Sequence, residues 1–266
     1  RMKAEGDPIA DAVIRELFTS GEVGAVNRMI ETLVRSDDPI PAGLPPVTRR
    51  FFDEQDALPP WADLAKIREG QDLFERWGWA VASTLFCSSL PQLYAFPRGA
   101  RVLLYTEGLE KHAWRRVVET AQFVFDVCVE GGLEAKGRGI RTIQKVRLMH
   151  AAIRHMVLAQ TGARAWDPAF GVPISQWQLA GTLQTFSSVV LDGLGAMGVT
   201  LSPREVDAWM HVWNVVGHLL GLRPELLPRD ATDGEALFEV LKAEWGASPQ
   251  GHALANATLE LMRGLI

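Results

Sequence analysis

The chain has 266 residues, of which 47% are apolar, so it can bury a sizeable core without disulfides or a structural metal. Its 27 Lys and Arg against 32 Asp and Glu give a net charge of −5, which argues against nucleic acid as a partner. No apolar run reaches the roughly 20 residues of a membrane span, so none is predicted. Cys87 and Cys128 form no CxxC or zinc motif, and we predict two buried packing residues.

Residues 1–62 are predicted to form a short helix over 11–33 and then an extended arm that packs on the core. The arm follows from six prolines within residues 37–60, which are too many for a helix interior. If Met2 is the native start, the acidic residues after it lack the apolar segment of a signal peptide, which predicts a cytoplasmic protein. A leader removed earlier would leave no trace here.

Residues 63–266 are predicted to form a single all-α domain. Helical periodicity dominates, and the alternating patterns and Asn-Gly turns of a sheet are missing. Ser202-Pro203-Arg204-Glu205 predicts a capped helix start, and Gly221 a helix end. The helices are expected over 63–89, 100–106, 110–129, 139–161, 175–197, 203–220, 234–244 and 251–265.

The predicted helix over 139–161 carries the first candidate for chemistry. Ile143, Val146, Ile153 and Val157 fall in one narrow stripe at 100° per residue, and His150 lies in its middle. A neutral imidazole in an apolar stripe needs a partner for each ring nitrogen. Two interpretations are open: a buried iron that the imidazole ligates, or a core histidine bonded to a backbone carbonyl.

The predicted helix over 110–129 places a cation on an apolar face. Arg116 and Thr120 are four residues apart and share this face with Phe123. A buried guanidinium keeps its charge and needs an anion. That anion is either a carboxylate or phosphate of a ligand, or an acid of the protein such as Glu119.

Other polar clusters indicate less. His211 and His218 are seven residues apart and so lie on one helix face, which would suit a metal pair, but two neighbouring tryptophans favour a core helix. The basic residues over 136–147 predict a solvated face, with Arg147 turned toward an anionic ligand. The common nucleotide-binding and hydrolase motifs are absent from the sequence.

A series of short motifs runs in order through residues 63–228. The first are Arg116-x3-Thr120, Gly137-Arg138-Gly139 and Lys145-Val-Arg147-Leu-Met-His150-Ala. Further motifs are Ser89-Leu90-Pro91 with Tyr94, Trp166-Asp167, Gly171-Val-Pro173-Ile-Ser-Gln176, Gly181-Thr182 with Phe186-Ser187, and Trp213-x3-Gly217-His218. Together they resemble the catalytic domain of the rubber oxygenase (latex-clearing protein) and MpaB oxygenase family.

The resemblance implies a globin-like helical bundle that holds one haem b. The haem is non-covalent, because the sequence has no CxxCH motif. His150 matches the family's proximal axial ligand, and Arg116 and Thr120 match its signature pair beside the haem. In this arrangement, Arg147 is expected to contribute to cofactor binding.

The implied activity is that of a haem-dependent (di)oxygenase, in which O2 is transferred to the C=C bond of a hydrophobic, isoprenoid or unsaturated lipid-like substrate. Gln176, Thr182 and Phe186 are expected on the distal or substrate side. Counterparts of the family's distal lysine and catalytic carboxylate are not identified, and Glu119 is a candidate acid only by proximity. A small terpenoid or prenyl chain therefore suits this chain better than polyisoprene.

Two alternatives stay open at this point. One is a haem-binding sensor, carrier or electron-transfer protein without oxygenase turnover, and the other is a cofactor-free helical scaffold or lipid-binding module. The sequence does not determine the substrate or whether a reductant partner is needed. It also leaves the oligomeric state open, and a homo-oligomer is one of the possibilities.

Overall fold

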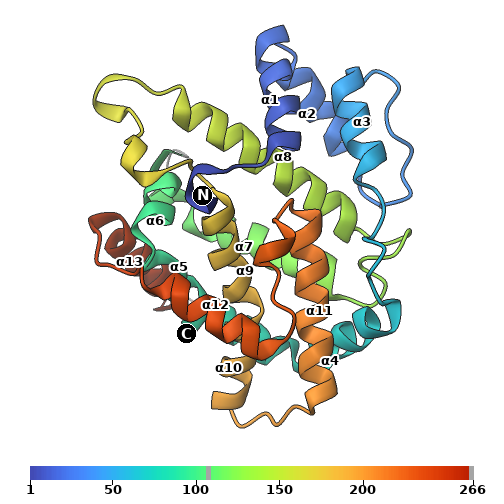
Figure 1. Ribbon diagram of the computed structural model, residues 1–266, viewed down its shortest axis with the longest axis vertical. Helices are drawn as coiled ribbons and strands as arrows, with labels where there is room; N and C mark the ends of the chain where they lie inside the picture. Colours follow the sequence, from blue (N-terminus) through green and yellow to red (C-terminus); the bar gives the residue numbers. More distant parts are fainter. Residues whose placement is uncertain (106–108, 264–266) are drawn as a thin grey trace.

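Helices form all the regular secondary structure in the described residues of the computed structural model (Figure 1). The structure describes residues 1–105 and 109–263, with the side chains of residues 104, 109–114, 116, 163, 261 and 262 set aside. The predicted all-α class is confirmed. The α-helices are α1 Pro8–Ser20, α2 Val23–Glu31, α3 Pro46–Glu54, α4 Leu64–Thr84, α5 Leu90–Tyr94, α6 Pro97–Tyr105, α7 Leu109–Cys128, α8 Gly139–Leu158, α9 Gln176–Phe186, α10 Ser188–Ala196, α11 Pro203–Leu219, α12 Ala231–Lys242 and α13 Pro249–Arg263.

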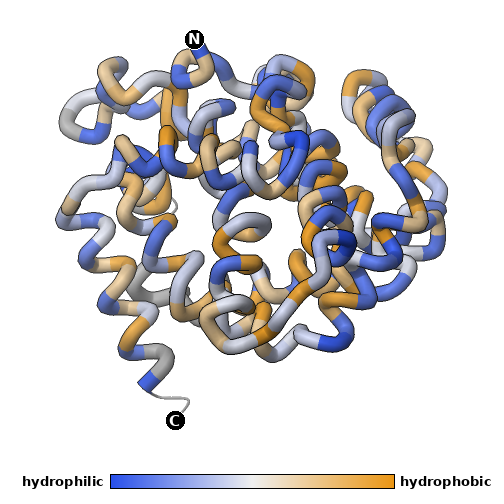
Figure 2. Tube along the Cα trace, turned by 60° about the horizontal axis from the view of Figure 1, so that its bottom comes forward, coloured by the Kyte–Doolittle hydropathy of each residue, from blue (hydrophilic) through white to orange (hydrophobic). Residues whose placement is uncertain are grey.

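The main core lies where α4 and α11 run side by side, with α7, α9 and α10 packed around them (Figure 1). Trp209 and Trp213 are its largest fully buried apolar side chains. Apolar and hydrophilic residues alternate along the helices in Figure 2, as expected for amphipathic helices with one face in a core. Within the described part of the chain, no helix has the length and apolarity needed to cross a membrane.

The N-terminal segment differs in detail from the prediction. Its first helix is divided into α1 and α2 because Gly21 adopts a left-handed conformation (φ 74°) that ends α1. Residues 37–60 are not wholly extended, since they contain α3. This helix begins with Pro46 at its first position, where the backbone N–H that proline lacks would have no partner within the helix. Apolar residues of these three helices pack on Leu148 and Ala151 of α8, while the division into 1–62 and 63–266 stays a prediction.

A π-helical segment, η2 Leu85–Ser89, connects α4 to α5. The N–H of Leu90 donates to the carbonyl of Leu85, five residues back, and Pro91 has no N–H to restore the α-helical register. Cys87 in this segment is exposed, so the prediction that it is buried was wrong. Cys128 is buried as predicted, and burial raises the pKa of its thiol, which keeps it a neutral packing residue.

The predicted helix over 175–197 is interrupted at Ser187, where α9 ends and α10 begins. Both the N–H and the Oγ of Ser187 donate to the carbonyl of Leu183, each at 3.0 Å. A serine hydroxyl that competes for a helix carbonyl in this way favours a break. Helices α11 and α8 begin at the predicted residues.

The start of α11 makes a testable prediction about acid stability. Glu205 accepts a hydrogen bond from the Ser202 N–H (2.7 Å) and another from Arg76 (2.6 Å). The Ser202 N–H, then Arg76 and the Ser202 hydroxyl, lower the pKa of Glu205 from 4.5 to about 2. A lowered carboxyl pKa stabilises the fold above pH 4.5, and this contribution is lost as the pH falls toward 2. Glu205→Gln is therefore expected to lower the Tm near neutral pH.

Thermal unfolding followed by circular dichroism between neutral pH and about pH 2 checks this expectation. The Tm difference between wild type and Glu205→Gln should shrink steadily below pH 4.5. Glu235→Gln, a change at an exposed residue of α12, is the control and should leave the Tm nearly unchanged. A Glu205→Gln effect that stays constant over the whole range would contradict the assignment.

Candidate functional site

A large apolar cavity of about 560 Å³ lies between α4, η2, α5, α7 and the end of α9. This volume is typical of pockets that hold a small molecule or cofactor. The cavity is lined by Phe74, Glu75, Gly78, Ala82, Leu85, Phe86, Ser89, Leu90, Leu93, Val117, Thr120, Ala121, Val124, Phe125, Val129, Thr185 and Phe186. Glu75 is the ionisable side chain among these residues.

Helical periodicity explains two walls of the cavity. On α4, the lining residues Gly78 and Ala82 are four positions apart and so share one face, while Phe74 lies before the kink at Trp77 (φ −121°, ψ 17°). On α7, Val117, Thr120, Ala121 and Val124 follow the i, i+3, i+4, i+7 pattern of a single stripe. The cavity therefore lies between two helix walls that are apolar apart from the carboxylate of Glu75 on α4 and the hydroxyl of Thr120 on α7.

Two of the predicted site residues, Thr120 and Phe186, are brought together in this cavity wall. Phe186 is held in place by stacking on the buried Trp213, with ring centroids 4.9 Å apart and an interplanar angle of 25°. Phe123 of α7 packs edge-on against the same phenyl ring (6.4 Å). Phe186 thus presents a fixed apolar surface to whatever occupies the cavity, as expected for packed aromatic rings.

His150 lies on α8, which contributes no lining residue to the cavity. The turn over 129–138 reverses the chain between α7 and α8, and Thr142 donates to Asp126 (2.7 Å) across the two helices. His150 lies eight residues after Thr142 on α8, and Val118 lies eight residues before Asp126 on α7. Eight residues correspond to about 12 Å along a helix. His150 itself is half-buried, and α8 packs against α7, the helix that carries residues 116–120.

Arg116 belongs to the first half of α7, one helical turn before Thr120. Its side chain lies outside the described residues, so its predicted contact with a ligand stays a prediction. Glu119 is described, and its carboxylate forms an exposed pair with Arg115 (2.7 Å). It does not line the cavity.

Arg147 does not face the cavity. Its Nε and Nη2 donate to the two carboxylate oxygens of Asp7 (2.5 and 3.0 Å), and its Nη1 donates to Gln55 (2.7 Å). Both side chains of the pair are only 4% exposed. The anion that pairs with the Arg147 guanidinium is thus the carboxylate of Asp7, 140 residues away in the sequence. The sequence analysis had expected an anionic group of a ligand.

Gln176 is fully occupied by backbone partners rather than exposed to a ligand. Its amide nitrogen donates to the carbonyls of Gly6 and Gly221 (both 2.9 Å), and its amide oxygen accepts from the N–H of Arg223 (2.8 Å). The side chain is 1% exposed. It connects the N-terminal segment, the start of α9 and the segment after α11.

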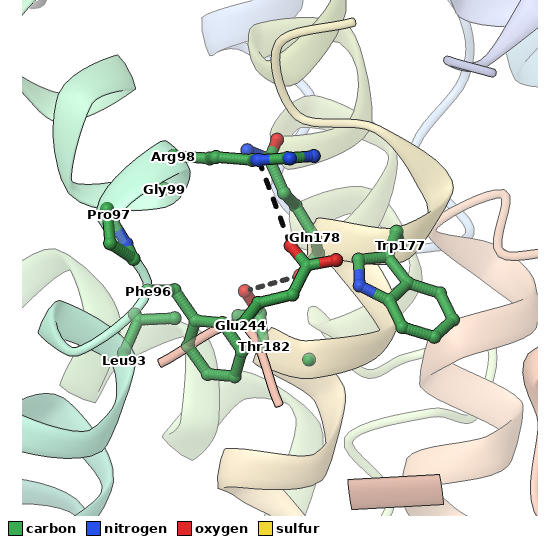
Figure 3. A pocket seen from close by; sticks show the side chains of 10 residues that line it. Leu93, Phe96, Pro97, Arg98, Gly99, Trp177, Gln178, Thr182 and Glu244 are labelled. Atoms are coloured by element: carbon green, nitrogen blue, oxygen red, sulfur yellow. Dashed lines mark hydrogen bonds and ion pairs between the residues drawn. The ribbon is translucent and has the colours of Figure 1, made fainter. Parts of the chain in front are cut away.

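Thr182 lines a second, much smaller pocket between α5, α6, α9 and Glu244, shown in Figure 3. This pocket has about 30 Å³, room for roughly one water molecule. The Thr182 hydroxyl donates to the carbonyl of Gln178 in its own helix (3.0 Å), and Arg98 lies 3.9 Å from Glu244 across the pocket (Figure 3). Thr182 and Phe186 therefore face different spaces.

His211 and His218 do not form a metal pair. Both imidazoles pack edge-on against the indole of Trp61 at 5.7 Å, and the Nε2 of His211 accepts from the N–H of Asp63 (2.9 Å). Burial lowers the pKa of both imidazoles, which favours their neutral forms. Among the described residues, no group of three or more His, Cys, Asp or Glu could hold a metal ion.

The sequence interpretation missed the wall formed by α4, η2 and α5. Phe74, Gly78, Phe86 and Leu93 line the cavity, yet nothing in their types points to chemistry. Two signals were present: the four-residue spacing on α4 and the Ser89-Leu90-Pro91 motif, which was noted without a role. Neither reveals which helix stands opposite.

Comparisons with known proteins agree with this arrangement. Residues 73–265 match the family model described as ER-bound oxygenase mpaB/B'/Rubber oxygenase, catalytic domain. The chain is 30% identical over 267 residues to the rubber oxygenase of Streptomyces sp. (strain K30), which covers 97% of this chain and 64% of that protein. This chain thus spans less than two thirds of that relative.

The fold is also similar to the solved structure of the latex clearing protein in its closed state, with a TM-score of 0.87 and 27% sequence identity. The match covers all of this chain and 71% of the other. The family match includes α7, α8 and α9, the helices that carry Thr120, His150 and Phe186. The chain therefore belongs to the family of mpaB and rubber oxygenase catalytic domains.

Proposed function

We propose that this chain is a b-type haem-dependent oxygenase domain that uses O2 to oxidise or cleave a C=C bond in a hydrophobic, isoprenoid or unsaturated lipid-like substrate. The observation that carries the proposal is the large apolar cavity beside Thr120, inside a fold that belongs to this oxygenase family. A site of this size and apolarity suits a porphyrin or a hydrocarbon and disfavours charged metabolites.

The residues present are compatible with haem b. An imidazole is a side chain that haem iron commonly takes as a ligand, and His150 would supply it from α8, which packs against the helix that carries Thr120. Arg116, one turn before Thr120, would pair with a haem propionate.

When bound, the haem supplies the iron that binds and activates O2. In the proposed mechanism, His150 would hold the cofactor through one ring nitrogen, and the Thr120 hydroxyl would offer a hydrogen bond to a ligand in the cavity. The apolar walls of the cavity exclude water, and Phe186, fixed by its stacking on Trp213, orients the unsaturated chain. Arg147 and Gln176 act on the fold rather than on the ligand.

Absorption spectra of the purified protein, before and after dithionite and CO, test the proposal. A Soret band that shifts on binding CO is expected, together with O2 consumption and carbonyl products when an isoprenoid such as farnesol is added. A colourless protein that takes up no added hemin would overturn it. A six-coordinate ferrous protein that binds no CO and consumes no O2 would instead identify a sensor, carrier or electron-transfer protein.

A further inference from the structure

Gly78 is an unusual residue for the interior of a long helix. It lies in α4 (Leu64–Thr84), where glycine destabilises a helix relative to alanine. Its φ is not positive, so its backbone conformation is open to any residue. A Cβ added at this position would meet only the Cζ of Phe74, at 3.9 Å, which is an ordinary contact. The residue before it, Trp77, departs from helical geometry (φ −121°, ψ 17°), so α4 is kinked next to Gly78, but neither a positive φ nor tight packing requires a glycine at position 78 itself.

Other helical glycines of this fold have an evident packing reason. A Cβ at Gly70, two turns earlier in α4, would lie 2.6 Å from Val212 and 2.8 Å from the carbonyl of Ala208 in α11. A Cβ at Gly217 would lie 2.7 Å from Leu183. These two glycines let neighbouring helices approach, whereas the space in front of Gly78 is the large cavity itself.

Gly78 is half-buried and lies on α4 between Glu75 and Ala82, two exposed residues that also line the cavity. Phe125 in the α7 wall is 56% exposed, and Ala121 is exposed as well. Other lining residues are buried, among them Ser89 (3%) and Val124 (3%). A residue without a side chain at position 78 therefore leaves the cavity wide next to its exposed lining residues.

Charge restricts the class of ligand that the cavity suits. Glu75, three residues before Gly78, is an exposed lining residue, and its carboxylate accepts from the N–H of Glu130 (3.3 Å). No Lys or Arg is found among the described lining residues. A fatty acid would bring its carboxylate next to Glu75, where like charges repel. A neutral chain, such as an isoprenoid hydrocarbon or alcohol, has no such penalty.

We propose that Gly78 determines the width of the cavity next to its exposed lining residues and thereby which neutral isoprenoid chains the cavity admits. The inference rests on the proposed function only because it takes a neutral isoprenoid as the substrate. Gly78 is a specificity-determining residue in this account, and any side chain larger than methyl at position 78 occupies volume that the ligand needs.

Equilibrium dialysis of the protein as purified with labelled farnesol tests the inference. Gly78→Leu is expected to weaken binding by about tenfold or more, the loss expected when about two methylene groups of ligand are displaced. Gly78→Ala should bind within about threefold of wild type and unfold at a higher Tm, because alanine favours the helix. Palmitoleate should bind more weakly than farnesol.

The matched control is Gly24→Leu, at an exposed glycine of α2 outside the cavity, which should leave farnesol binding unchanged. If Gly78→Leu does not fold, Ala82→Leu tests the same wall one turn later. The inference would be overturned if Gly78→Leu or Ala82→Leu bound farnesol as tightly as the wild type does. It would also be overturned if the wild type bound palmitoleate as tightly as farnesol. A Gly78→Leu effect in a protein without haem or oxygenase turnover would support the inference while removing the proposed function.

Discussion

Asp7→Ala is expected to lower the free energy of unfolding by about 3–5 kcal/mol, because it leaves the buried guanidinium of Arg147 without its anion. The pair is bidentate, with 2.5 and 3.0 Å between nitrogens and oxygens, and both side chains are only 4% exposed. Asp7 also caps α1 by accepting from the N–H of Ala10 (3.2 Å). Losing a cap costs about a further 1 kcal/mol, although the two losses need not add.

Urea unfolding monitored by circular dichroism measures this effect. Asp207→Ala is the matched control, because Asp207 forms a similarly short ion pair with Lys66 (2.5 Å) whose two side chains are 46% and 42% exposed. Exposed pairs contribute about 0–1 kcal/mol, so the control should lose little stability. Similar losses in both variants would show that burial does not set the strength of the Asp7 interaction.

His150→Ala is expected to leave the purified protein with little or no haem. In the proposed function His150 would hold the haem iron, and removal even of a residue that only orients a metal ligand commonly weakens metal binding about 10–100-fold. The Soret absorbance per protein should fall at least to that extent, and the Tm should drop to that of the haem-free wild type, since a haem that binds only the folded state stabilises it. Added imidazole should restore part of the Soret band.

The matched control for this experiment is His155→Ala on the same helix. His155 lies five residues further along α8, about 140° around the axis, and packs against Phe18 of α1 with ring centroids 4.4 Å apart. It should keep the haem of the wild type. Retention of haem by His150→Ala, with an unchanged ferrous spectrum, would remove His150 from the site and leave the family fold without its predicted ligand.

Local signals predicted the helices wherever caps and breakers act within a few residues. Ser202 and Glu205 form the reciprocal bonds of a capping box at the start of α11, and Gly221 turns with a φ of 82° after its end. The same local logic overlooked Ser187, because it does not tell whether a serine hydroxyl bonds its own backbone or points to a neighbour.

The partners of buried polar side chains could not be predicted in this way. The sequence directed Arg147 and Gln176 toward a ligand, whereas both side chains are buried against groups of the protein. Asp7 lies 140 residues from Arg147, and the carbonyl of Gly6 lies 170 residues from Gln176. These contacts exist only because α1 and the segment before it pack along α8 and α9.

The 266 residues, 47% apolar and with a net charge of −5, by themselves determined an all-α protein that can bury a large core, because helix periodicity and capping are written into neighbouring residues. The tertiary structure alone decided which faces meet. It placed Thr120 and Phe186 in one cavity and paired Arg147 with Asp7. It also placed Gly78, a residue that disfavours a helix, in the wall of that cavity. Packing between distant helices creates empty space, and no local pattern records it.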